Sequence, residues 1–103
     1  AELLAFNLLQ HLDFAPALAY QWIASDRTMY QLCGYQLLAR LFARRMEPNE
    51  RGINEFLDQA RTTLEGEDLS LRHAAYNCVL GFCELGPDFE AVAKKALAGL
   101  NLL

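Results

Sequence analysis

The feature that most constrains this chain is a short segment that occurs twice. Residues 32–37 read LCGYQL and residues 73–78 read HAAYNC, so that Tyr76 follows Tyr35 by 41 residues. In both copies two small residues precede the tyrosine and a side-chain amide follows it. Small residues on a helix leave room for a neighbouring backbone, and the tyrosine can fill the space beside it. Each copy therefore predicts the same close contact between two helices.

Apolar residues recur along the chain at steps of three and four, which is the spacing of one face of an α-helix. The clearest pattern runs from Met29 through Leu37 to Phe42. On this spacing we predict six helices, over about residues 2–12, 16–25, 27–46, 53–65, 68–85 and 88–100. No segment alternates between apolar and polar residues in steps of two, so no β-sheet is expected.

The ends of these helices are predicted from residues that start or stop a helical hydrogen-bond ladder. Asp13, Asp26 and either Glu67 or Asp68 are candidate N-caps, because a carboxylate can accept hydrogen bonds from the unpaired N–H groups of a first turn. Residues 47–52 contain proline, asparagine and glycine and are predicted to form a loop. A glycine is expected to end the fourth helix, and a Gly-Pro pair the fifth.

The order of helices and the repeated segment together predict the fold class. A short helix, a tight turn and a long helix recur with the repeat, whose spacing falls in the range of about 40 to 47 residues typical of HEAT and armadillo repeats. Stacked helix pairs of this kind bury a continuous core. We predict an all-α fold, a HEAT-like α-solenoid of five to six helices in antiparallel pairs. One domain is expected over residues 1–103, as a piece of a longer chain, because the sequence opens on an apolar pattern without methionine.

Composition limits which partners and which cellular compartment we expect for this protein. With 9 Lys and Arg against 13 Asp and Glu, the formal net charge is −4, which argues against a molecule-wide electrostatic clamp on nucleic acid. Cys33, Cys78 and Cys83 lie within apolar helical patterns and form no C-x-x-C pair, so we predict reduced thiols in a cytoplasmic protein. No apolar run approaches the roughly 18 residues of a membrane span, and no membrane partner is expected.

Residues 22–26, Trp-Ile-Ala-Ser-Asp, are followed by a long helical pattern that opens on Gln31 and two small residues. This corner resembles the bacterial DNA alkylation repair family, the HEAT-like 3-methyladenine DNA glycosylases. The resemblance covers about residues 14–100 and corresponds to the C-terminal half of that family. It implies a scaffold that wraps duplex DNA in a concave groove. Members of the family excise alkylated bases from the bound DNA.

The resemblance does not carry the catalytic residues of that family onto this sequence. The family uses an Asp and Trp residues on an earlier helix, together with an Arg on the helix after the corner. Met29 stands where the family has a Trp of that helix, and Leu32 stands where it has the Arg. The Asp-bearing helix would precede Ala1 or be segment 2–12, which contains no Trp. No catalytic residue is predicted, and whether the chain is an enzyme stays open.

The candidate nucleic-acid-binding residues are the only basic cluster of the sequence. It consists of Arg40, Arg44, Arg45 and Arg51. Arg40 and Arg44 share a helix face, and guanidinium groups fit phosphate oxygens well, so the cluster could contact a DNA backbone. The alternative is a solvated helix end whose cations complement the helix dipole, and the negative net charge favours this second interpretation.

Other polar and aromatic residues have two interpretations each. Four aromatic residues could hold a flipped base, namely Trp22, Tyr30, Tyr35 and Tyr76. Aromatic residues at helical spacing are more often part of the core. Gln36 and Asn77 follow the repeated tyrosines and could bridge helices or bind a ligand. His11 and His73 lack further ligands at suitable spacing, so neither a metal site nor a cofactor is expected.

Two functions from different classes therefore remain. The first is a DNA-binding scaffold related to alkylation repair, without a recognisable catalytic site and with duplex DNA as partner. The second is a protein-interaction or structural α-solenoid with no DNA role. The first requires Arg40, Arg44 and the neighbouring cations to line one concave face. In either case, apolar faces exposed at the ends of the stack are expected to favour a homodimer.

Overall fold

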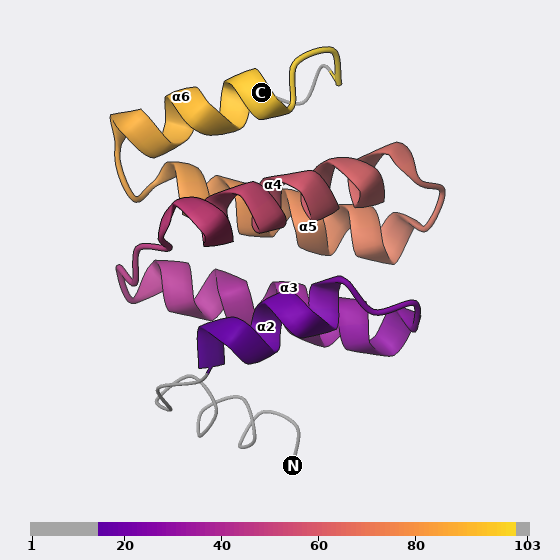
Figure 1. Cartoon of the computed structure of the whole chain (residues 1–103). Helices are drawn as coiled ribbons and strands as arrows, with labels where there is room; N and C mark the ends of the chain where they lie inside the picture. The colour runs from indigo at the N-terminus through magenta and orange to yellow at the C-terminus, as the bar shows by residue number, and fades with distance from the viewer. Residues whose placement is uncertain (1–14, 101–103) are drawn as a thin grey trace.

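The computed structural model describes residues 15–100 of the chain, and this part is all-helical (Figure 1). Its five helices are α2 (Ala15–Ile23), α3 (Thr28–Ala43), α4 (Glu50–Glu65), α5 (Leu69–Cys83) and α6 (Pro87–Ala96). Residues 15–100 contain no β-strand, so the predicted all-α class is confirmed. The helix predicted over residues 2–12 and its cap Asp13 lie outside the described residues.

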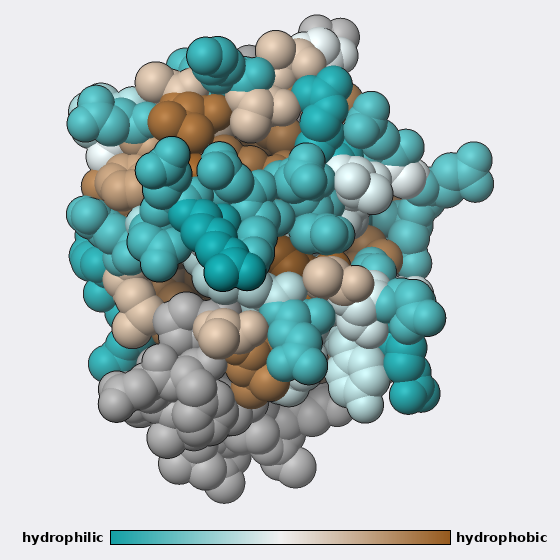
Figure 2. All heavy atoms as spheres, in the orientation of Figure 1, coloured by the Kyte–Doolittle hydropathy of each residue, from teal (hydrophilic) through white to brown (hydrophobic). Residues whose placement is uncertain are grey.

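The helices form two layers. Consecutive helices α2 and α3 pack together, as do α4 and α5. Helix α3 also contacts α5, and α4 contacts both α2 and α6. Helices α2, α4 and α6 therefore share one layer, while α3 and α5 form the other (Figure 1). Hydrophilic side chains cover the outer face of α4 in Figure 2, where Asn54, Asp58 and Thr62 are exposed.

The core repeats with the same spacing as the two tyrosines. Six pairs of buried residues lie 41 positions apart, and each pair occupies corresponding places in α2 and α4 or in α3 and α5. They are Ala19 and Ala60, Ile23 and Leu64, Gly34 and Ala75, Leu37 and Cys78, Leu38 and Val79, and Leu41 and Phe82. The spacing continues into α6 and its C-cap, where Ala93 of α6 corresponds to Gly52 and the C-cap Leu97 to Phe56. One packing pattern therefore extends through all five helices.

Four phenylalanines join the two layers. Phe42, Phe56 and Phe82 come from α3, α4 and α5, and their ring centroids lie 5.3 to 5.6 Å apart. Phe89 of α6 extends the cluster, with its ring 5.4 Å from that of Phe82 and nearly perpendicular to it. Edge-to-face contacts of this kind add to the free energy gained by burying the rings.

Close approach of α2 and α3 depends on Gly34. A Cβ atom at this position would lie 2.7 Å from Cγ2 of Ile23 and 2.8 Å from its backbone nitrogen. Only a residue without a side chain fits there. The prediction that the first small pair admits a neighbouring helix is therefore confirmed, and the buried Ala75 stands at the corresponding place in α5.

Two predicted helix starts are corrected by the structure. The N-cap of α3 is Arg27, which makes no side-chain capping bond, so the predicted capping role of Asp26 is wrong. The Ser25 hydroxyl oxygen instead accepts a hydrogen bond from the Arg27 backbone nitrogen at 3.1 Å. Helix α4 begins at Glu50, inside the predicted loop, because the Asn49 side chain accepts a bond from the Gly52 nitrogen at 2.8 Å.

Helix α5 starts as one of the two predicted alternatives. The Asp68 carboxylate accepts a hydrogen bond from the Leu71 backbone nitrogen at 3.0 Å, so Asp68 rather than Glu67 is the N-cap. Asp68 follows the N-cap of α3, Arg27, by 41 residues. The two helices of this layer therefore begin at equivalent positions, although only one of them has a side-chain cap.

Helix α3 ends three residues earlier than predicted because the backbone reverses at Arg45. This residue has a φ of 64°. Its backbone nitrogen donates to the Phe42 oxygen at 2.9 Å, and that of Met46 donates to the Leu41 oxygen at 3.1 Å. These bonds satisfy the last carbonyl groups of the helix. A left-handed residue here is usually glycine, which explains why the sequence pattern gave no stop signal.

Candidate binding groove

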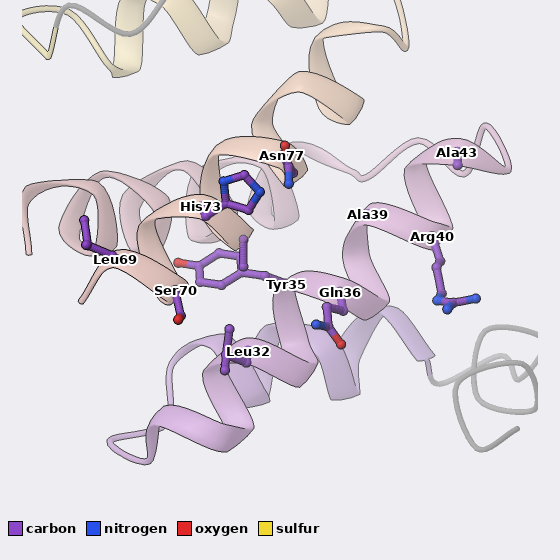
Figure 3. Close-up of a pocket in the computed structure, with 11 residues that line it drawn as sticks. Leu32, Tyr35, Gln36, Ala39, Arg40, Ala43, Leu69, Ser70, His73 and Asn77 are labelled. Carbon is purple, nitrogen blue, oxygen red and sulfur yellow. The ribbon is translucent and has the colours of Figure 1, made fainter. Parts of the chain in front are cut away.

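A groove lies between α3 and α5 and has a volume of about 870 Å³ (Figure 3). We call it the α3/α5 groove. Its lining comprises Leu32, Tyr35, Gln36, Ala39, Arg40, Ala43, Leu69, Ser70, His73, Ala74 and Asn77. The groove exists because α3 and α5 are neighbours in the same layer and direct their buried residues toward the other layer.

Polar side chains from both helices line this groove. Gln36 and Arg40 lie one turn apart on α3, and His73 and Asn77 lie one turn apart on α5 (Figure 3). Gln36, His73 and Asn77 are exposed. The side-chain amides of Gln36 and Asn77 make no hydrogen bond to another of the residues 15–100. Both amides are therefore available to a ligand.

The lining of the α3/α5 groove is less acidic than that of the groove between α2 and α4. Within residues 15–100, no carboxylate is among the lining residues of the α3/α5 groove, and Arg40 adds a guanidinium group. The groove between α2 and α4, in the other layer, includes Glu55 and Asp58 beside Arg51. Electrostatic repulsion of an anionic ligand is consequently weaker in the α3/α5 groove than in the groove between α2 and α4.

Tyr35 forms the floor of the groove and has no exposed surface. Its hydroxyl group lies 2.7 Å from the Thr63 hydroxyl oxygen on α4. Burial raises the pKa of Tyr35 to about 12, although the hydrogen bond with Thr63 acts in the opposite direction. Tyr35 is therefore a neutral structural residue that holds α3 against α4.

The structure separates the four candidate arginines. Arg40 lines the α3/α5 groove, and Arg44 is the exposed C-cap of α3. Arg45 donates a hydrogen bond of 2.6 Å to the Glu84 carbonyl oxygen at the end of α5. Arg51 lies in the other layer, where it forms an ion pair of 3.2 Å with Glu55. Arg40 is thus the only one of the four that lines this groove.

The candidate aromatic residues also lie in separate places. Trp22 and Tyr30 stack with ring centroids 6.4 Å apart where α2 meets α3, and the Arg27 guanidinium carbon lies 5.2 Å from the Tyr30 ring centroid. Tyr76 is half-buried against the core. None of Trp22, Tyr30 and Tyr76 lines the α3/α5 groove, whereas Tyr35 lies beneath its surface.

The positions that the family resemblance singles out differ in their surroundings. Leu32 lines the α3/α5 groove, and its repeat equivalent His73 lines the same groove from α5. Met29 is 65% exposed and is not part of the lining. Sequence reasoning considered His73 only as a metal ligand, although its 41-residue offset from Leu32 could have indicated a shared surface.

Neither Cys78 nor Cys83 is an activated nucleophile. Burial raises the pKa of Cys78 well above its ordinary value. Burial raises the pKa of Cys83 as well, with Glu90 adding to the effect. Within residues 15–100, no three His, Cys, Asp or Glu side chains are arranged to hold a metal ion, and no helix is long and apolar enough to cross a membrane.

Comparison with known proteins gives no match: no family model, no curated protein and no solved structure matches this chain.

Proposed function

We propose that this chain is a HEAT-like piece of an α-solenoid, related to the DNA alkylation repair family, that binds duplex DNA in the α3/α5 groove. The proposal includes no catalytic centre of its own in this part of the chain. The observation that carries it is that Leu32 and Arg40 line one groove, in which none of the lining residues within 15–100 is a carboxylate.

The solenoid part of the proposal is supported by the repeated core. Equivalent helices α2, α4 and α6 occupy one layer, α3 and α5 the other, and buried residues recur every 41 positions in both. Stacking of equivalent helix pairs is the way in which solenoid repeats bury their apolar faces. The second helices of successive pairs then form one continuous surface, which here contains the α3/α5 groove.

The DNA-binding part is supported by the place of Leu32. This residue stands where the resembling family has an Arg, and it faces the groove that also contains Arg40. A surface without carboxylates and with a guanidinium group suits phosphate oxygens, which are negatively charged acceptors. A leucine offers no hydrogen-bond donor, which supports a scaffold role rather than base excision at this position.

A protein-binding function is the second candidate, and specific observations favour it. Apolar side chains, including those of Leu32, Leu69 and Ala74, form much of the groove lining. Arg45 and Arg51 are engaged by Glu84 and Glu55, outside the groove. In this alternative the groove receives a polypeptide segment, and Arg40 contributes a single polar contact.

Fluorescence anisotropy with a labelled DNA duplex across a salt series tests the first candidate. Arg40→Ala should weaken binding and reduce the slope of log affinity against log salt by about one, because one phosphate contact is lost. Arg51→Ala removes the same charge from the opposite layer and should leave the slope close to that of the wild type. Arg45 is a poor choice because it also stabilises the end of α5.

Two results would decide against DNA binding in the α3/α5 groove. The first is an absence of duplex binding by the wild-type chain even at low salt. The second is an equal loss of affinity in the Arg40 and Arg51 variants, which would indicate a nonspecific charge effect. Either result leaves the protein-binding function as the better explanation of the groove.

A further inference from the structure

Two side-chain amides occupy equivalent positions of the two repeats and face the same groove. Gln36 on α3 and Asn77 on α5 are 41 residues apart, and both line the α3/α5 groove (Figure 3). Tyr35 and Leu37 on either side of Gln36 are fully buried, and so is Cys78 beside Asn77. The helix rotation that buries these neighbours therefore fixes the direction of both amides.

The hydrogen-bonding character of the groove points to a ligand rich in acceptors. Arg40 is a donor only, and each amide contributes two N–H donors in addition to its oxygen. The part of the lining that residues 15–100 provide contains no carboxylate. Phosphodiester oxygens are acceptors only, so this surface complements a nucleic-acid backbone better than it complements a cation or an amine.

We propose that Gln36 and Asn77 are the hydrogen-bonding residues with which the groove holds the phosphodiester backbone of bound duplex DNA; this inference rests on the proposed function. One amide in each repeat presents the same donor to the groove. A polymer with regularly spaced acceptors can engage both donors at once. The amides act without net charge, whereas Arg40 contributes the electrostatic part of binding.

The first test removes the hydrogen bonds and preserves side-chain volume. The double variant Gln36→Leu with Asn77→Leu should bind a labelled duplex about tenfold more weakly, since each lost bond costs a few-fold in affinity. Its salt slope should equal that of the wild type because no cation is removed. The matched control is Gln21→Leu with Asn54→Leu, which changes two exposed amides on α2 and α4 outside the groove.

The second test keeps the side-chain shape and adds charge. Gln36→Glu with Asn77→Asp places two carboxylates toward the phosphates and should abolish binding at moderate salt. Gln21→Glu with Asn54→Asp adds the same net charge on the other layer and should weaken binding far less. Circular dichroism melting curves of all four variants verify that the helices remain folded.

The outcomes separate this inference from the function on which it rests. Selective loss of affinity in both groove variants supports it. If the wild type binds duplex DNA and the groove variants bind as tightly as their controls, the amides do not contact the backbone and only this inference fails. If the wild-type chain binds no duplex, the proposed function and the inference fail together.

Discussion

The Tyr35 hydroxyl group on α3 lies 2.7 Å from the Thr63 hydroxyl oxygen on α4, beneath the floor of the α3/α5 groove. This bond connects the first helix pair to the second across the two layers. Tyr35 has no exposed surface, whereas Thr63 is half-buried. The bond therefore satisfies a buried phenol that water does not reach.

We expect Tyr35→Phe to lower the free energy of unfolding by about 1 kcal/mol, because a buried hydrogen bond is lost while the ring still fills its place. Urea denaturation measures the change. Tyr30→Phe is the control, since Tyr30 is 43% exposed and its change should be close to neutral. A double-mutant cycle with Thr63→Val isolates the pair. A coupling energy near zero would show that the bond does not contribute to stability.

Stability should decrease at alkaline pH. Burial raises the pKa of both Tyr20 and Tyr35 from 10.0 to about 12. Unfolded chains then lose these protons at lower pH than folded ones, so the contribution is complete below pH 10 and is lost as pH rises toward 12. Urea denaturation from neutral pH to about pH 11 should show this decrease. The double variant Tyr20→Phe with Tyr35→Phe should lose less stability over that range than the wild type does.

Gly34→Ala should destabilise the protein by about 1 to 3 kcal/mol, because its methyl group would collide with Ile23 at 2.7 Å and the backbone there cannot move aside cheaply. Gly81→Ala is the matched helical control. Its nearest atom would be the Phe42 Cβ at 3.7 Å, an ordinary contact. Alanine there should stabilise the helix by about 0.5 to 1 kcal/mol. Thermal unfolding measures the change in stability of both variants. If both substitutions changed the stability in the same direction, the close approach of α2 and α3 would be contradicted.

Arg45→Ala and Arg45→Gly should differ in stability although both remove the bond to Glu84. Alanine retains the cost of a left-handed backbone at a φ of 64°, and glycine does not. We expect the glycine variant to be more stable than the alanine variant by about 1 kcal/mol. Chemical denaturation provides the comparison. Equal stability would mean that the reversed backbone at the end of α3 is not maintained in solution.

Leu32→Arg should strengthen duplex DNA binding and steepen its salt dependence by about one phosphate contact, because it adds a guanidinium group to the α3/α5 groove. Val92→Arg adds the same charge on α6, at a residue that is 43% exposed and outside this groove. Anisotropy titrations compare the two variants. Equal gains in affinity would indicate that net charge alone is responsible.

Much of the helical architecture follows from the sequence, but the extent of the repeat does not. The segment around Tyr35 and Tyr76 indicates one pair of equivalent helices. The structure adds equivalences such as Ile23 with Leu64 and Gly52 with Ala93. These residues share burial and a place in the packing but not identity. A core position is selected for volume, so different residues can fill equivalent places without a visible sequence repeat.

The sequence alone determined that this part of the chain is helical, because apolar spacing of three and four residues is a local property of one helix face. It also marked Gln36 and Asn77 as equivalent. Only the tertiary structure decided that both line one groove, and that Arg40 and Arg51 lie in different layers. The physical reason is that helix pairing depends on burial of distant residues such as Phe42, Phe56 and Phe82 against one another, which no local pattern specifies.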